Sequence, residues 1–178
     1  MDKKSLIAIL FLVNLNLSAF EIVTGLKTFS GAGGGYTNTS GTYFPSYDTS
    51  NLLLQIGHYK NSDKEGWGFG WHLGGSYAYD ESKWYYGSNF EFGMAIGYTL
   101  LKDLNLKGEF GLGLNFINVN NATIAPYVGA AIDYAIVEHY LVGLSFRKYK
   151  GIADTNKPSS DSYDYSPTAT TVYLGYRF

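Results

Sequence analysis

The stretch GWGFGWHLGGSYAYD, residues 66–80, places large side chains on alternate positions. One parity carries tryptophan, phenylalanine, leucine and tyrosine, whereas the other carries mainly glycine, with His72 and Ser76 among the glycines. A repeat of two residues is typical of a β-strand, whose successive side chains point to opposite faces of the sheet. The stretch therefore predicts a strand with one bulky apolar face and a second face on which space is scarce.

The composition indicates a chain built largely from such strands. Its 178 residues include 22 glycines, 17 tyrosines and 11 phenylalanines, and only 16% are charged. The length suits one domain, and the lack of cysteine excludes disulfides and cysteine-ligated metals. A formal net charge of −2 gives no electrostatic case for binding nucleic acid. The loop aspartates Asp154, Asp161 and Asp164 do not follow the spacing of a calcium-binding loop, so we expect no metal or cofactor.

The N-terminal residues have the pattern of a secretory signal peptide. Charged residues at positions 2–4 precede an apolar run over 6–13, and Ala19 offers a small residue for cleavage before Phe20. A membrane-anchor helix is the alternative, but it needs roughly 20 apolar residues, and Asn14 and Asn16 interrupt this run. We therefore expect a signal peptide over residues 1–19 and a single β-domain over 20–178.

The alternating pattern recurs along the rest of the chain and predicts eight strands. The patterned segments are 22–27, 51–57, 66–79, 86–100, 104–116, 124–136, 140–147 and 172–178. The connections alternate in length: 61–65, 102–103 and 137–139 are short, and 31–49, 80–85, 118–121 and 150–167 are longer. An even number of antiparallel strands with turns at one end and loops at the other is typical of outer-membrane barrels. The predicted fold class is all-β, an eight-stranded antiparallel up-and-down transmembrane β-barrel.

The placement of charge indicates which face lies inside. A soluble lipocalin-like barrel also alternates, but it holds its ligand in an apolar interior. Here the charges in the middle of the strands fall on the glycine-bearing face, and the aromatic face carries charge only at its rims, at Lys60 and Lys148. A basic residue facing lipid at the bilayer midplane costs about 2–4 kcal/mol, so the aromatic face is expected to contact lipid. The predicted lumen residues are Lys27, His72, Glu91, Lys107, Glu109, Asp133, Arg147 and Arg177.

The charges of these lumen residues nearly balance, with Glu21 at the edge of the set. Buried charges need partners, so we expect a salt-bridged and hydrogen-bonded core that fills the lumen. The alternative is a gate, in which the pairs rearrange and let ions pass. Pro126 lies within the sixth predicted strand and cannot donate a backbone hydrogen bond, so we expect a bulge or the start of the strand there.

Two stretches of the sequence resemble segments of a known superfamily. APYVGAAIDYAIVEHYLVGLSFRKY, residues 125–149, resembles the penultimate hairpin of small OmpA-like and opacity-type outer-membrane barrels. TVYLGYRF, residues 171–178, is similar to the terminal strand of that superfamily and of OmpW-type barrels. The resemblance implies a porin-like barrel of the Gram-negative outer membrane, whose last strand is read by the barrel assembly machinery. The residues that match this assembly signal are Val172, Leu174, Tyr176 and Phe178. The peptidoglycan-binding domain of OmpA has no counterpart here, so a wall-anchoring role is not carried over.

The sequence predicts no catalytic residues. A lipid-modifying barrel needs a histidine and a serine within hydrogen-bond reach. His139, at a predicted turn, and Ser145 share a face, but six residues of strand separate them by about 20 Å. We therefore expect no enzyme.

The first long loop, 31–49, and the fourth, 150–167, are polar and rich in tyrosine. Such residues form adaptable contact surfaces in binding loops. We expect a monomeric barrel in the bacterial outer membrane, in contact with membrane lipid, with a structural or surface-interaction role. A narrow channel for ions or small, including hydrophobic, solutes is the alternative. The candidate contacts to an extracellular ligand are Tyr43, Phe44, Tyr47, Tyr163 and Tyr165.

Overall fold

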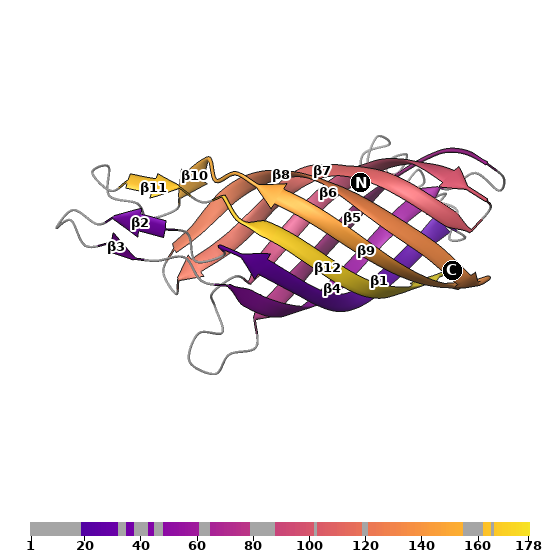
Figure 1. Ribbon diagram of the computed structural model, residues 1–178, viewed down its shortest axis with the longest axis horizontal. Helices are drawn as coiled ribbons and strands as arrows, with labels where there is room; N and C mark the ends of the chain where they lie inside the picture. Colours follow the sequence, from indigo (N-terminus) through magenta and orange to yellow (C-terminus); the bar gives the residue numbers. More distant parts are fainter. Residues whose placement is uncertain are drawn as a thin grey trace, which may run out of the picture.

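Eight long strands make up most of the molecule. The computed structural model describes residues 19–31, 35–37, 43–44, 48–60, 65–78, 88–101, 103–118, 121–154, 162–164 and 166–178. The long strands are β1 (Phe20–Ser30), β4 (Thr49–Lys60), β5 (Gly66–Ala78), β6 (Asn89–Leu100), β7 (Leu104–Asn118), β8 (Asn121–Val137), β9 (Tyr140–Tyr149) and β12 (Thr168–Arg177). The short strands are β2 (Gly35–Thr37), β3 (Tyr43–Phe44), β10 (Ala153–Asp154) and β11 (Ser162–Asp164) (Figure 1). Within the described ranges, no helix has the length and hydropathy that a membrane-spanning helix needs.

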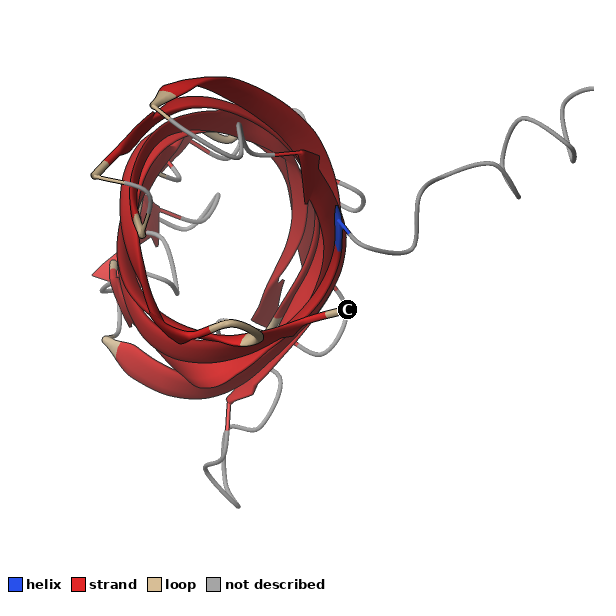
Figure 2. Cartoon of the chain, turned by 90° about the vertical axis from the view of Figure 1, so that its right-hand side faces the viewer, coloured by secondary structure: helices blue, strands red, loops and turns tan. Residues whose placement is uncertain are grey.

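The long strands close into a barrel. They pair antiparallel in the order β8-β7-β6-β5-β4-β1-β12-β9, and the pairing of β8 with β9 completes the ring. The first and last long strands meet in this wall, because β1 pairs with β12 from Glu21 opposite Arg177 to Ser30 opposite Thr168. Viewed along its axis, the barrel is a continuous ring of strands (Figure 2). The predicted eight-stranded antiparallel barrel is confirmed. We call the end at which β8 joins β9 the turn end, and the opposite end the loop end.

The two faces of the barrel wall differ in the way that the alternation predicts. On the outward face Leu26, Trp67 and Phe92 are 61%, 73% and 53% exposed, whereas Lys27, the neighbour of Leu26, is fully buried. The charged side chains in the middle of the described strands all point inward. The wall thus has apolar side chains outside and polar side chains inside, which is the reverse of a water-soluble protein.

The glycines of the inner face make room for inward-pointing tyrosines. A Cβ atom would collide with a tyrosine at several of these positions, for example at Gly93 with Tyr127, at Gly143 with Tyr173 and at Gly97 with Tyr59. An eight-stranded barrel has an interior just wide enough to be filled by side chains. A ring that lies across such a lumen therefore needs a residue without a side chain on the wall that it meets.

Pro126 lies inside a continuous strand, so the expectation of a bulge or a strand start there is wrong. β8 begins five residues earlier, and Pro126 pairs in register with Leu112 of β7. On its other side the Pro126 carbonyl accepts a hydrogen bond of 3.0 Å from the amide of Lys150, where β9 has already ended. The hydrogen bond that Pro126 cannot donate would go to the carbonyl of Lys150, an exposed residue just past the end of β9, so the loss falls outside the β8–β9 ladder. The irregularity of this hairpin lies instead between Phe116 and Asn118 of β7.

Gly93→Ala is expected to destabilise the barrel more than the matched variant Gly108→Ala. A methyl group at position 93 would meet the Tyr127 hydroxyl and the His72 ring. Gly108 faces outward, and a methyl group there would lie 3.8 Å from the nearest atom, the Ile96 carbonyl oxygen. Overpacking of this kind costs about 1–3 kcal/mol. Urea unfolding in lipid vesicles, followed by tryptophan fluorescence, measures the difference. Equal stabilities of the two variants would contradict the space-making role of the inner glycines.

Candidate functional site

Two groups of charged side chains fill the lumen. The loop-end cluster consists of Lys27, Glu91, Glu109 and Arg147, and the turn-end cluster consists of Glu21, Lys107, Asp133 and Arg177. Each cluster contains two acidic and two basic residues, so each is neutral by itself.

Glu91 is the centre of the loop-end cluster. Its Oε1 atom accepts hydrogen bonds from Lys27, Asn89 and Tyr149, and its Oε2 atom pairs with Arg147. These partners come from β1, β6 and β9, so one carboxylate joins strands from different sides of the lumen. Donors surround the carboxylate, which is what a charge without access to water requires.

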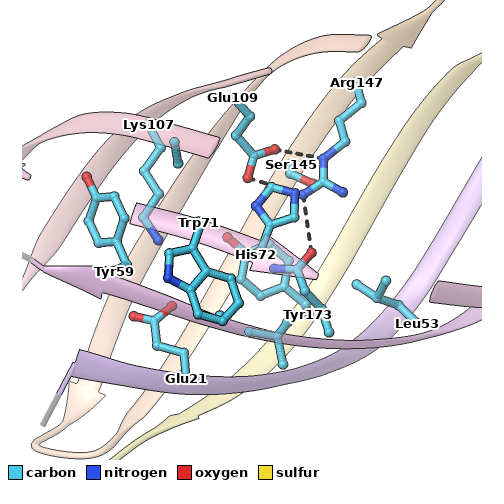
Figure 3. A pocket seen from close by; sticks show the side chains of 14 residues that line it. Glu21, Leu53, Tyr59, Trp71, His72, Lys107, Glu109, Ser145, Arg147 and Tyr173 are labelled. Atoms are coloured by element: carbon cyan, nitrogen blue, oxygen red, sulfur yellow. Dashed lines mark hydrogen bonds and ion pairs between the residues drawn. The ribbon is translucent and has the colours of Figure 1, made fainter. Parts of the chain in front are cut away.

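Arg147 links Glu91 to the second carboxylate of this cluster. Its Nε donates to Oε2 of Glu109 at 2.8 Å and its Nη2 to Oε1 at 3.2 Å, which is a bidentate pair (Figure 3). The same Nη2 lies 3.4 Å from Oε1 of Gln55, and the guanidinium lies 5.2 Å from the ring centroid of Tyr127. Arg147 therefore holds β4, β6, β7 and β8 together from its own position on β9.

The turn-end cluster consists of two separate pairs. Lys107 pairs with Asp133, which also accepts a hydrogen bond from the Tyr173 hydroxyl. Nearer the rim, Nε of Arg177 donates to Oε1 of Glu21 at 2.8 Å. These two residues lie at the ends of the chain's first and last barrel strands, so this pair also stabilises the closure of the ring.

A small cavity lies between the two clusters. Its volume is about 30 Å³, and members of both clusters line it, together with Ser145 and the apolar side chains Val23 and Leu53 (Figure 3). A polar cavity of this size holds a water molecule or two, since one probe-sized site needs about 10–15 Å³.

An aromatic cluster lies on the loop-end side of Lys27. It comprises Phe29, Ala125, Tyr127, Tyr149 and Ala169, all buried. The Tyr149 ring centroid lies 5.6 Å from that of Phe29 and 5.3 Å from that of Tyr127. The members come from β1, β8, β9 and β12, and the Phe29 ring centroid lies 4.9 Å from the Lys27 ammonium, so the rings pack directly against this charge.

The structure places all eight predicted lumen residues on the inner face, and the charged ones are paired with one another or with Glu21. His72 makes no ion pair among the described residues; its Nε2 atom is hydrogen-bonded to the Tyr127 hydroxyl at 2.6 Å.

Sequence reasoning missed the inward tyrosines as partners of the charged lumen residues. The available signal was their position on the glycine-bearing parity, which they share with the charged residues. The tyrosines missed are Tyr59, Tyr127, Tyr149 and Tyr173.

His139 and Ser145, the pair weighed for catalysis, lie in different surroundings. His139 is exposed in the turn between β8 and β9, where its Nδ1 atom is hydrogen-bonded to the Arg177 carbonyl at 2.9 Å. Ser145 is buried inside the lumen. His139 lies in the turn that precedes β9, so the strand alternation does not extend to it and the two side chains do not share a face.

The four residues of the predicted assembly signal lie at the outward-facing positions of β12 and just after it. Val172, Leu174 and Phe178 are exposed, and the Tyr176 ring packs against those of Tyr140 and Phe178, with centroid distances of 5.1 Å and 5.0 Å. β12 itself is hydrogen-bonded to neighbours on both of its edges.

Segments of the first and fourth loops join in one small sheet. β2 pairs with β3 and also with β11, so that residues more than one hundred positions apart in sequence lie side by side (Figure 1). Of the candidate ligand contacts, Tyr43 and Phe44 form β3 and Tyr163 lies in β11. The register places Tyr36 of β2 opposite both Phe44 and Tyr163. Tyr47, Tyr165 and the signal-peptide residues 1–18 lie outside the described residues.

Solved structures with the same architecture come from bacterial outer membranes. The N-terminal β-barrel domain of Pseudomonas aeruginosa OprF superposes with a TM-score of 0.56 at 12% identity, covering 90% of this chain and 98% of that one. OprG of the same organism gives 0.55 at 14%, covering 89% and 95%. Ail, the attachment invasion locus protein of Yersinia pestis, gives 0.53 at 12%, covering 89% and 97%.

The chain has the fold of the small eight-stranded outer-membrane barrels. The resemblance of its last hairpin and terminal strand to such barrels is thereby confirmed at the level of fold. No protein-family model and no curated protein matches the sequence. With identities of 14% or less, the likeness to these barrels is one of architecture.

Glu91→Gln is expected to destabilise the barrel by about 3–5 kcal/mol, because it leaves two buried cations to share one carboxylate. The control is the double variant Lys27→Met with Glu91→Gln, in which the loop-end cluster is neutral again and Arg147 keeps Glu109. We expect the double variant to recover a large part of the lost stability in urea unfolding. If it is no more stable than Glu91→Gln alone, charge balance is not what stabilises the cluster.

Proposed function

We propose that this chain is a bacterial outer-membrane barrel protein with a structural or surface-interaction role, and that its first and fourth loops together form its contact surface. The observation that carries the proposal is the inversion of the barrel wall, which has large apolar side chains all around the outside and paired charges inside. A lipid bilayer is the solvent that suits such an outer face. Residues 1–19 then act as the export signal.

The small sheet supports the surface-interaction role. Its three strands bring the first and fourth loops together beyond the barrel, with Tyr36 opposite Phe44 and Tyr163. Aromatic residues supply contact area at low entropic cost and are frequent in binding loops. Two proteins of the same fold carry names that fit such a role, namely the attachment invasion locus protein of Yersinia pestis and Neisserial surface protein A.

The assembly signal fits the same proposal. In the closed barrel β12 has no free edge, since it pairs with β1 and β9. The barrel assembly machinery would therefore read Val172, Leu174, Tyr176 and Phe178 before the ring closes. None of the described contacts calls for an enzymatic role.

A narrow channel is the second candidate, and one observation favours it. Arg147 contacts both Glu91 and Glu109, so its guanidinium could exchange between two carboxylates and open a path beside them. The aromatic cluster on the loop-end side of Lys27 opposes this function, because a conducting path has to pass the Phe29 and Tyr149 rings.

Planar-bilayer recording separates the two candidates. The structural role predicts no steady channels for the wild-type chain and none for Lys107→Met, because that variant leaves the loop-end cluster and the aromatic cluster intact. Steady single-channel currents in the wild type whose amplitude changes in Glu91→Gln or Lys107→Met would favour transport instead. Refolded protein that shows heat-modifiable migration on gels serves as the sample throughout.

The surface role predicts that the paired loops act together. Bacteria producing the protein are expected to adhere to cultured epithelial cells more strongly than bacteria without it. Deletion of residues 155–161, or triple substitution of Tyr36, Phe44 and Tyr163 by serine, is expected to abolish this increase in adhesion. Gly108→Ala, on the lipid-facing wall, is the matched variant that should adhere like the wild type. Adhesion that survives both loop changes would remove the proposed contact surface.

A further inference from the structure

The outward face of the barrel wall turns polar on one side of the molecule, near the loop end. The strands β4, β1, β12 and β9 lie side by side there (Figure 1). Leu26 of β1 still belongs to an apolar row, because its partners on the two neighbouring strands are Leu52 and Val172. Closer to the loop end, the outward positions of these four strands carry mainly hydroxyl groups and lysines. We call this set the polar patch, and its members are Thr28, Ser30, Ser50, Lys148, Lys150, Thr168 and Thr170.

The opposite side of the wall stays apolar at the same height. A strand tilted by about 40° advances roughly 2.5 Å along the barrel axis per residue. Thr28 is eight residues from Phe20 at the turn end of β1, and Phe90 is eight residues from Tyr98 near the turn end of β6. Thr28 and Phe90 therefore lie at similar heights, about 20 Å above the turn end. The outward residues of β5 to β8 at this end include Tyr77, Phe90, Leu114, Phe116 and Ile124.

The polar patch lies at the depth of lipid headgroups. Ser30 is ten residues from Phe20, which places it about 25 Å above the turn end. The apolar band of an outer-membrane barrel is also about 25 Å tall. Lipid tails would therefore cover the wall at Leu26, and headgroups would meet it between Thr28 and Ser30.

The side chains of the polar patch can donate several hydrogen bonds to one acceptor. Thr28 pairs directly with Thr170, and the Cβ atoms of such cross-strand neighbours lie about 5 Å apart. Lys148 is the cross-strand partner of Thr168, and its ammonium donates to the Ser166 carbonyl at 2.5 Å. An ammonium has three donor hydrogens, so this bond fixes the side chain beside Thr168 and leaves donors for a ligand. A phosphate group, with several acceptor oxygens, suits such a set of donors.

The charge of the polar patch favours an anionic partner. It contains Lys148 and Lys150 and no carboxylate. Asp48, which precedes β4, is an acidic residue at this end of the wall, and its Oδ1 atom accepts a hydrogen bond of 3.0 Å from the Gly31 amide. A second copy of this chain fits less well, because a symmetric contact through the patch would bring the lysines of both copies together within the membrane. A lipid tail has no acceptor for these donors.

We propose that the polar patch is a binding site for the phosphate group of a membrane lipid. The phosphate accepts hydrogen bonds from Lys148, Lys150 and the hydroxyls of the patch, and the lipid's acyl chains lie along the apolar row at Leu26 and Val172. The site occupies one side of the barrel, so lipid binding is unequal around the wall. This inference rests on the proposed outer-membrane role and names the lipid chemistry that the wall recognises.

Native mass spectrometry of the folded barrel in a non-ionic detergent tests the site. The probes are dioleoyl phosphatidic acid and dioleoylglycerol, which have the same acyl chains and differ in the phosphate. We expect the wild type to bind the phosphatidic acid about tenfold or more tightly, because hydrogen bonds to a charged group are the stronger ones. Equal binding of the two probes would overturn the proposal.

Two double variants and one control assign the preference to the patch. Lys148→Met with Lys150→Met is expected to lose most of the preference, whereas Lys60→Met, which removes an outward lysine at the turn end of β4, keeps it. Thr28→Val with Thr170→Val preserves size and charge and is expected to weaken phosphatidic acid binding about threefold or more. This second variant also covers the case in which the lysine variant does not fold.

The remaining outcomes are decisive as well. A folded lysine variant that binds like the wild type would overturn the proposal. So would a dimer in the spectrum that the threonine variant removes, because a second copy would then occupy the patch. Insertion into lipid vesicles is measured on the same preparation. A wild type that does not insert would contradict the outer-membrane role and this site together, whereas inserted protein without a phosphate preference would contradict the site alone.

Discussion

Closing eight strands around a narrow lumen forces each enclosed charge to have a partner within reach. The wall has no room for a water shell around an isolated ion, and an unpaired buried charge costs several kcal/mol. Glu91 meets this requirement with four donors, and Arg147 meets it with two carboxylates. The requirement fixes side-chain identity at positions far apart in the chain, since exchanging one member of a cluster leaves the others uncompensated.

The same lack of space explains the unusual pairing of tyrosine with glycine. A tyrosine that points inward has to lie across the lumen, and its hydroxyl then reaches the polar network: that of Tyr149 donates to Glu91 and that of Tyr173 to Asp133. The wall opposite the ring needs a residue without a side chain, such as Gly143 opposite Tyr173. The inward tyrosines therefore donate hydrogen bonds to buried carboxylates, whereas the outward aromatic residues face the surroundings of the barrel.

Much of this architecture could be predicted from the sequence, because alternation is a local property. The pattern of residues 66–80 already separates the two faces, and its recurrence predicts the number of strands. The partners of Arg147 could not be predicted, since it meets Glu91 across 56 positions of sequence and the contact depends on the stagger of strands that are not neighbours. Pro126 was misjudged for a related reason: its tolerance depends on where β9 ends, and the pattern within β8 does not contain that information. The joining of the first and fourth loops also depends on barrel closure, which brings their roots together.

Charge neutrality within each cluster has a consequence for the loops. Among the described residues, the ion pairs of both clusters join side chains of the long strands. The aromatic rings pack against the loop-end side of Lys27, which is fully buried in a medium of low dielectric constant. A sequence change in the small loop sheet would thus leave the ion pairs between the long strands in place. Conduction through such a lumen would require the rings of the aromatic cluster to move and expose the buried pairs.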